Sequence, residues 1–213
     1  MTRIFIESGT NQSAKQGKLT TNEQNFVEEF IAHHFPTKRK GVDYEVIGIG
    51  GKDSLGNSVF PFRDNSLNGG KNVLLFDADT KDNAGGYSVR ATELLAEKNR
   101  LSLDFELFLW PNNSDDGDFE SLLMKMINPN HQCLLDCFTG FEMCIRGNDP
   151  KEEIYRTPDR KSAIYTYIHT FIKSQSEEKM MKSGVWFFND SRYWNLDADA
   201  GKPFHDFLTC VLC

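Results

Sequence analysis

The chain has 213 residues, of which 39% are hydrophobic and 26% charged, and its net charge is −7. This composition is typical of a globular protein, and the acidic balance disfavours a general nucleic-acid coat protein, which would be basic. The opening "MTRIFIES" lacks the apolar segment of a signal peptide, and no apolar stretch approaches the roughly 20 residues of a membrane span. We therefore expect a cytoplasmic protein.

Strand-like and helical patterns alternate along the chain through residue 127. The predicted strands are 3–7, 43–50, 72–79 and 104–110. The predicted helices are 20–35, 88–99 and 119–127, and residues 52–70 form a mixed segment. Such alternation predicts an α/β fold, with a Rossmann-like, mainly parallel four-stranded sheet flanked by helices. The strands would belong to a domain that covers residues 1–128.

The remainder, residues 129–213, predicts a mostly helical, aromatic-rich extension that packs on the same core. Its helical stretches are "HQCLLDCFTGFEMCI" and "RKSAIYTYIHTFIKS", and the loop 147–159 is the candidate junction between them. The aromatic side chains of the tail favour core packing over base stacking; they are Trp186, Phe187, Phe188, Tyr193 and Trp194. The five cysteines predict reduced thiols, because no secretory signal accompanies them. Cys133 with Cys137, and Cys210 with Cys213, favour small buried side chains over metal binding or redox work.

Three carboxylates stand at the ends of predicted strands. Glu7 closes the first strand, and Asp77 and Asp79 close the third. Residues two apart in a strand point to the same side, so we expect Asp77 and Asp79 to lie together, with Glu7 beside them if the two strands are neighbours. Like charges this close need a cation, and carboxylate oxygens suit Mg²⁺ or Mn²⁺. The alternative is that the two aspartates only form a turn.

A second acidic group follows the fourth strand and contains Asp115, Asp116, Asp118 and Glu120. We expect Asp118 or Glu120 to face the metal site. The alternative is that these acids are favoured by the dipole at the start of a helix.

Residues that could contact a phosphate follow the second and third strands. Gly50 and Gly51 would let the backbone approach a substrate, and Lys52 and Lys81 would supply positive charge, although a plain turn and a solvated lysine explain them equally well. The histidines predict no ligand site. His33 and His34 suit the C-terminus of a helix, and the others, which are His131, His169 and His205, are isolated in the sequence.

The order of these elements resembles the Toprim domain, which topoisomerases, primases, repair proteins and nucleases of the overcoming-lysogenization-defect type share. A closer resemblance is to small bacterial Toprim-related proteins of unknown function, some of them beside phage-defence systems. Three segments are similar to recurrent stretches of that group: "LLFDADTKDNAGG", "FLWPNNSDDGDFESLL" and "YWNLDADAGKPFHDFL".

The resemblance implies a metal-dependent nuclease. Glu7 would act as general acid/base or metal ligand, Asp77 and Asp79 would hold Mg²⁺, and Glu120 would be the additional acidic position of the nuclease branch. DNA or RNA would be the substrate, and a separate ATPase protein would be the partner in phage defence or DNA repair.

Two other classes of protein remain open. "LLFDADT" also resembles the metal-binding motif of nucleotide-sugar glycosyltransferases, although only about seventy residues precede it and Glu7 would then have no role. A non-catalytic regulatory module, in which the carboxylates hold a structural cation, is the other alternative.

Overall fold

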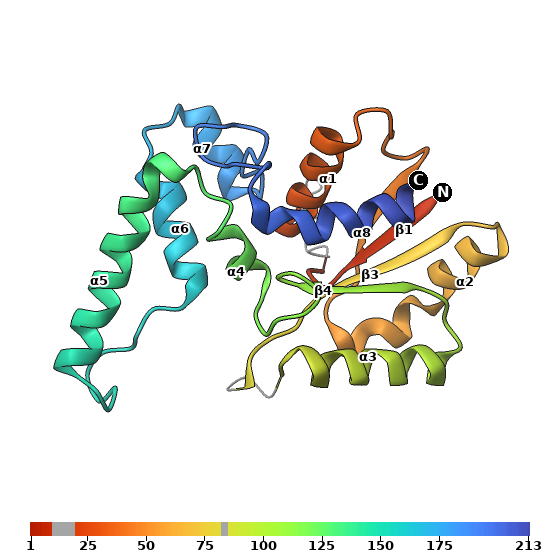
Figure 1. Cartoon of the computed structure of the whole chain (residues 1–213), viewed down its shortest axis with the longest axis horizontal. Helices are drawn as coiled ribbons and strands as arrows, with labels where there is room; N and C mark the ends of the chain where they lie inside the picture. The colour runs from red at the N-terminus through yellow and green to blue at the C-terminus, as the bar shows by residue number, and fades with distance from the viewer. Residues whose placement is uncertain (10–19, 82–84) are drawn as a thin grey trace.

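The computed structural model describes residues 1–9, 20–81 and 85–213, and for residues 52 and 53 the backbone alone. At its centre lies a parallel four-stranded sheet in the order β2-β1-β3-β4 (Figure 1). The strands are β1 (Thr2–Ile6), β2 (Tyr44–Gly48), β3 (Lys71–Asp77) and β4 (Glu106–Trp110). The predicted α/β fold with a parallel sheet is therefore confirmed.

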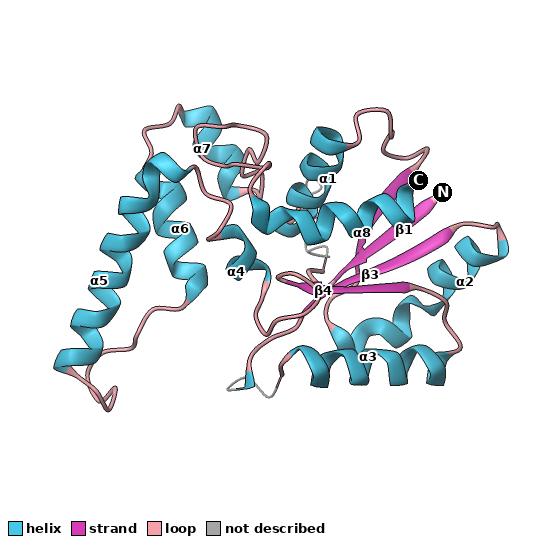
Figure 2. Ribbon diagram, in the orientation of Figure 1, coloured by secondary structure: helices cyan, strands magenta, loops and turns pink. Residues whose placement is uncertain are grey.

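Helices cover both faces of this sheet (Figure 2). The longer ones are α1 (Asn22–His34), α2 (Val59–Leu67), α3 (Tyr87–Leu101), α5 (Gln132–Asn148), α6 (Arg160–Thr170), α7 (Gln175–Lys182) and α8 (Lys202–Leu212). The shorter ones are η1 (Lys52–Ser58), α4 (Phe119–Leu123), η3 (Pro129–His131) and η4 (Asp199–Gly201). Helices α1 and α8 lie on one face of the sheet, and α2 and α3 lie on the other.

Alternation along the strands divides the hydrophobic core into two clusters, one on each face of the sheet. In β1, Ile4 and Ile6 belong to the cluster under α1 and α8, whereas Phe5 belongs to the cluster over α2 and α3. Phe5 stacks on Phe62 of α2 with ring centroids 3.6 Å apart. Because strands buried on both faces are apolar throughout, the short runs in the sequence predicted them well.

Helix α8 completes the first cluster from the far end of the chain. The Phe204 ring lies 4.7 Å from Trp110, 5.2 Å from Phe30 and Phe108, and 6.3 Å from Phe26. The same cluster takes in four of the tail aromatics, whose predicted core packing is confirmed, and Phe187 packs against it. These four are Trp186, Phe188, Tyr193 and Trp194.

Three sequence-based expectations differ from the structure. The mixed segment 52–70 contains η1 and α2, because Pro61 occupies the first turn of α2, where a proline needs no hydrogen-bond partner. The third strand ends at Asp77 rather than at residue 79. The predicted burial of four cysteines is wrong, since Cys133, Cys137, Cys210 and Cys213 are exposed free thiols.

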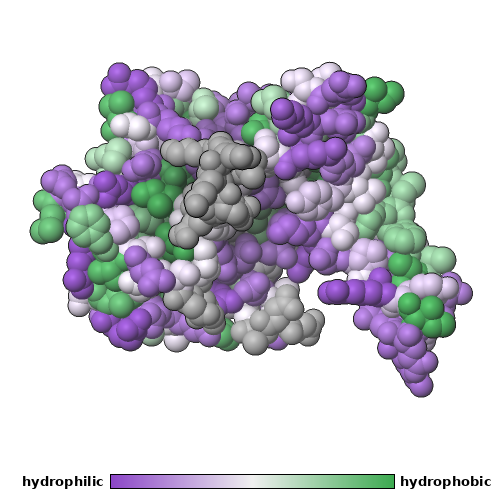
Figure 3. All heavy atoms as spheres, turned by 180° about the vertical axis from the view of Figure 1, so that it is seen from behind, coloured by the Kyte–Doolittle hydropathy of each residue, from purple (hydrophilic) through white to green (hydrophobic). Residues whose placement is uncertain are grey.

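Helices α5 and α6 form an arm that projects from the body of the molecule (Figure 1). Helix α5 buries Leu135, while Phe141 and Met143 are 54% and 68% exposed. In the reverse view most of the surface is hydrophilic, with separate hydrophobic patches, some of them on the arm (Figure 3). Within residues 1–9, 20–81 and 85–213, no helix combines the length and apolar character needed to span a bilayer.

We expect Phe204→Ala to lower the free energy of unfolding by about 3–5 kcal/mol, because it leaves a cavity among four aromatic rings. Urea denaturation followed by circular dichroism measures the change. Phe60→Ala is the matched control: Phe60 is 78% exposed, so its loss should stay within about 0.5 kcal/mol. Equal effects of the two substitutions would show that α8 does not belong to the core.

Candidate active site

The carboxyl ends of β1 and β3 form the point where the chain diverges to opposite faces of the sheet. After β1 the chain passes to α1 on one face, and after β3 it passes to α3 on the other. In open parallel sheets such a divergence leaves a crevice at the strand ends, and ligands bind there. Glu7 directly follows β1, and Asp77 is the last residue of β3.

Glu7 and Asp77 are joined across this divergence, as the sequence predicted for neighbouring strands. The backbone N–H of Asp77 donates to Glu7 Oε2 at 3.2 Å. The backbone N–H of Phe119, at the start of α4, donates to Asp77 Oδ1 at 2.8 Å. Both carboxylates are therefore oriented by backbone donors at fixed positions in the fold.

Glu23, in the first turn of α1, is a third acid at this site and was not predicted to belong to it. It is only 5% exposed. Trp110 Nε1 donates to its Oε1 at 2.8 Å, and the backbone N–H of Ser8 donates to its Oε2 at 3.1 Å. Burial raises the pKa of Glu23 to about 7, the donors from Ser8 and Trp110 oppose the rise, and the charge of Glu7 adds to it.

Asp77 experiences the combined charge of the surrounding acids. Burial raises its pKa well above the ordinary value, and the charges of Glu23, Glu7 and Glu120 raise it further, while the Phe119 N–H acts in the opposite direction. In the part of the chain that the structure describes, neither Asp77 nor Glu23 forms an ion pair with a lysine or arginine. A bound divalent cation would supply the missing positive charge, and carboxylate oxygens are the donors that Mg²⁺ prefers.

Asp79, unlike Asp77, is neutralised by a cationic side chain. Its φ of +59° lies in the left-handed region, and its side chain forms an ion pair with Arg90, which is 7% exposed and also bonds Glu93 Oε2 at 2.8 Å. The third strand ends at Asp77, so the alternation from which we expected Asp77 and Asp79 to point to the same side does not extend to Asp79, and that expectation stays a prediction. Gly85 permits this turn: a Cβ there would lie 2.4 Å from the Asp79 Cβ.

The predicted metal-binding trio does not form a compact cage. Among the described residues, Glu7, Asp77 and Asp79 are not a set whose oxygen atoms all lie within 4.8 Å of one another. Mg²⁺ commonly takes only one or two protein carboxylates and fills its other positions with water and substrate phosphate. Glu7 and Asp77 fit that arrangement, with Asp79 serving to hold Arg90.

The two acids of the α4 region have different roles. Asp118 caps α4, accepting the Ser121 N–H at 2.8 Å, and lies 3.4 Å from Arg160 Nη2. Glu120 is the one whose charge acts on Asp77. Burial raises the pKa of Glu120, and Lys161, with its Nζ 3.7 Å from Glu120 Oε1, opposes the rise.

The predicted phosphate-binding residues take up different positions. The N–H groups of Gly50 and Gly51 donate to the backbone carbonyl of Glu7 at 3.1 and 3.0 Å, so these glycines hold Glu7 rather than present their amides. The side chain of Lys52 lies outside the described residues. Lys81 is exposed beyond Asp79. Substrate binding by these four residues stays a prediction.

Comparison with known proteins gave no matching family model, no matching curated protein and no matching solved structure. The interpretation of the site therefore depends on the residues and their geometry.

We expect the pH dependence of stability to identify Glu23. Its pKa is 4.5 before folding and about 7 after it, so the stability contributed by the protonated form is complete below about pH 4.5 and is lost as the pH rises through about 7. Between about pH 5 and about pH 8, wild type should lose on the order of 1–3 kcal/mol more unfolding free energy than Glu23→Gln.

Urea denaturation in the presence of a chelator measures both proteins at each pH. Glu106→Gln, at an exposed position of β4, is the control and should follow wild type. Parallel pH profiles for wild type and Glu23→Gln would contradict a buried, titrating Glu23.

Proposed function

We propose that this protein is a Mg²⁺- or Mn²⁺-dependent nuclease or a related phosphodiester-transfer protein. The observation that supports it most directly is the group of acids at the carboxyl ends of β1 and β3. There Glu7 and Asp77 are linked by a hydrogen bond, Glu23 is buried beside them, and the charge of Glu120 reaches Asp77. The resemblance of the sequence to Toprim nucleases points to the same class of reaction.

In this proposal Glu7 and Asp77 are the metal ligands. A divalent cation held there would neutralise a phosphate oxygen and lower the pKa of a bound water. The Phe119 N–H keeps Asp77 in place, and Gly50 and Gly51 fix the backbone at Glu7. Glu23 acts as a positioning residue, because its carboxylate holds Ser8 next to Glu7 and is itself held by Trp110.

The wider setting rests on the resemblance alone. Nucleic acid, DNA or RNA, is the proposed substrate, and a separate ATPase protein in phage defence or DNA repair is the proposed partner. A cytoplasmic location belongs to the same proposal.

A non-catalytic module is the second candidate, and one observation favours it. Asp79, an expected metal ligand, is engaged by the buried Arg90, whose guanidinium already neutralises its charge. In that case Glu7 and Asp77 would bind a cation that stabilises the fold without cleaving a substrate.

We expect Asp77→Asn to reduce metal-dependent cleavage of DNA or RNA by at least about 100-fold, because the amide keeps the Phe119 bond and loses the charge that holds the cation. The assay follows labelled single-stranded DNA, duplex DNA and RNA with Mg²⁺ or Mn²⁺, and with a chelator. Asp104→Asn, at a side chain 89% exposed, is the control and should cleave like wild type.

Cleavage that survives Asp77→Asn or the chelator would reject the assigned site. Metal binding by wild type without cleavage of any of the three substrates would favour the non-catalytic module.

A further inference from the structure

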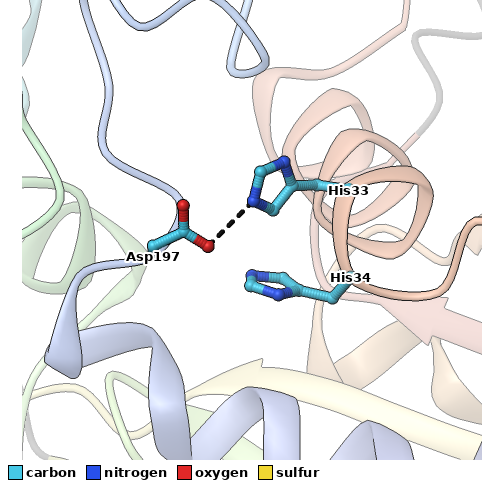
Figure 4. Close-up of side chains that lie close together, drawn as sticks. All are labelled: His33, His34 and Asp197. Carbon is cyan, nitrogen blue, oxygen red and sulfur yellow. Dashed lines mark hydrogen bonds and ion pairs between the residues drawn. The ribbon is translucent and has the colours of Figure 1, made fainter.

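A second cluster of metal-ligating side chains lies away from the carboxylates, where the end of α1 meets the segment before α8. His33 and His34 are the last residues of α1, and Asp197 precedes η4. His33 Nε2 lies 2.9 Å from Asp197 Oδ1. Figure 4 shows both imidazole rings directed toward the Asp197 carboxylate. One ligand atom from each residue can be chosen so that all three lie within 4.8 Å of one another.

The ring of His34 is held in position by its neighbours. Its Nε2–H donates to the backbone carbonyl of Leu196 at 3.1 Å, and its ring centroid lies 4.3 Å from that of Phe30. The His205 ring, from α8, lies 5.1 Å away. The C-terminal end of α1 favours positive charge, which would account for one histidine beside an aspartate. It does not account for two imidazole rings that both face the same carboxylate.

The cluster opens to solvent, so an ion could reach it. The His33 and Asp197 side chains are 40% and 72% exposed. Next to them lies a cavity of about 320 Å³, lined by His34, Asp197 and His205 among others. Asp199 and Asp206 also line it, and Asp206 is paired with Lys202, so Asp199 is the further acid that would attract a cation.

We propose that His33, His34 and Asp197 form a binding site for a transition-metal dication of the Zn²⁺ type. Two imidazole nitrogens and one carboxylate oxygen select zinc over Mg²⁺, which prefers oxygen ligands. A tetrahedral zinc ion with ligands at about 2.0–2.1 Å places them roughly 3.3 Å apart. Movement of the two exposed side chains, His33 and Asp197, toward His34 would bring the three ligand atoms to that spacing.

Metal binding would exchange protons for the ion. A neutral imidazole that coordinates through Nε2 would carry its proton on Nδ1 instead, and a protonated imidazole would release one proton to solvent. Water would fill the fourth position. The ion would tie the end of α1 to a segment 164 residues later, so we expect it to fasten the C-terminal region to the sheet.

The probe for this proposal is ZnCl₂ alone, titrated calorimetrically into the full-length protein under reducing conditions. We expect one saturable site in wild type and at least a 10-fold weaker affinity in His33→Ala and in Asp197→Asn, which keeps an acceptor for His33. Zn²⁺ should also raise the melting temperature of wild type more than that of either variant. His169→Ala, at an exposed histidine of α6, is the matched control and should bind like wild type.

Cobalt substitution separates this site from the exposed cysteines. Bound Co²⁺ should show d–d absorption without a thiolate-to-metal charge-transfer band. Equal Zn²⁺ affinity in wild type, His33→Ala and Asp197→Asn, a thiolate band, or no saturable binding would each overturn the proposal. Asp77→Asn should keep full Zn²⁺ affinity, so this result does not depend on the nuclease assay.

Discussion

The structure depends on the crowding of several partly or fully buried carboxylates at the carboxyl ends of two adjoining parallel strands. Burying one unpaired carboxylate is costly, and placing others beside it raises the cost further. Here Glu23 is buried, Asp77 is half-buried, and the charges of Glu7 and Glu120 reach Asp77. Burial and the neighbouring charges favour the protonated forms of Glu23 and Asp77, so the pKa values of both carboxyls are raised. A divalent ion bound between these carboxylates would offset the free-energy cost of holding them together.

The surrounding structure divides the acids into those that are neutralised internally and those that are not. Arg90 pairs with Asp79, and Arg160 lies beside Asp118, so both of these acids already have a cationic neighbour. Asp77 and Glu23 instead receive N–H donors from the backbone and from Trp110. Neutral donors orient a carboxylate without removing its affinity for a cation. The division explains why only part of the acidic sequence pattern belongs to the site.

Local sequence pattern predicted the sheet and most of its helices, because buried strands are short apolar runs and amphipathic helices have a clear period. The sequence pattern did not predict α2, because a proline usually interrupts a helix. Pro61 lies in the first turn of α2, where a proline is tolerated, and the sequence alone does not reveal that position. Strand ends predicted the meeting of Glu7 with Asp77 through sheet geometry. Glu23 could not be predicted in the same way, because its role arises from contacts with Ser8 and with Trp110, 87 residues away in the chain.

The bond from the Trp110 indole to Glu23 gives the site an internal optical reporter. An indole fluoresces differently when a carboxylate beside it gains or loses its charge, and a cation bound at Glu7 would offset the charge that helps to raise the pKa of Glu23. The emission of this buried tryptophan should therefore register whether the crevice is filled, without a label. Trp186 and Trp194 lie in another part of the same core, and their emission would form a constant background to that signal.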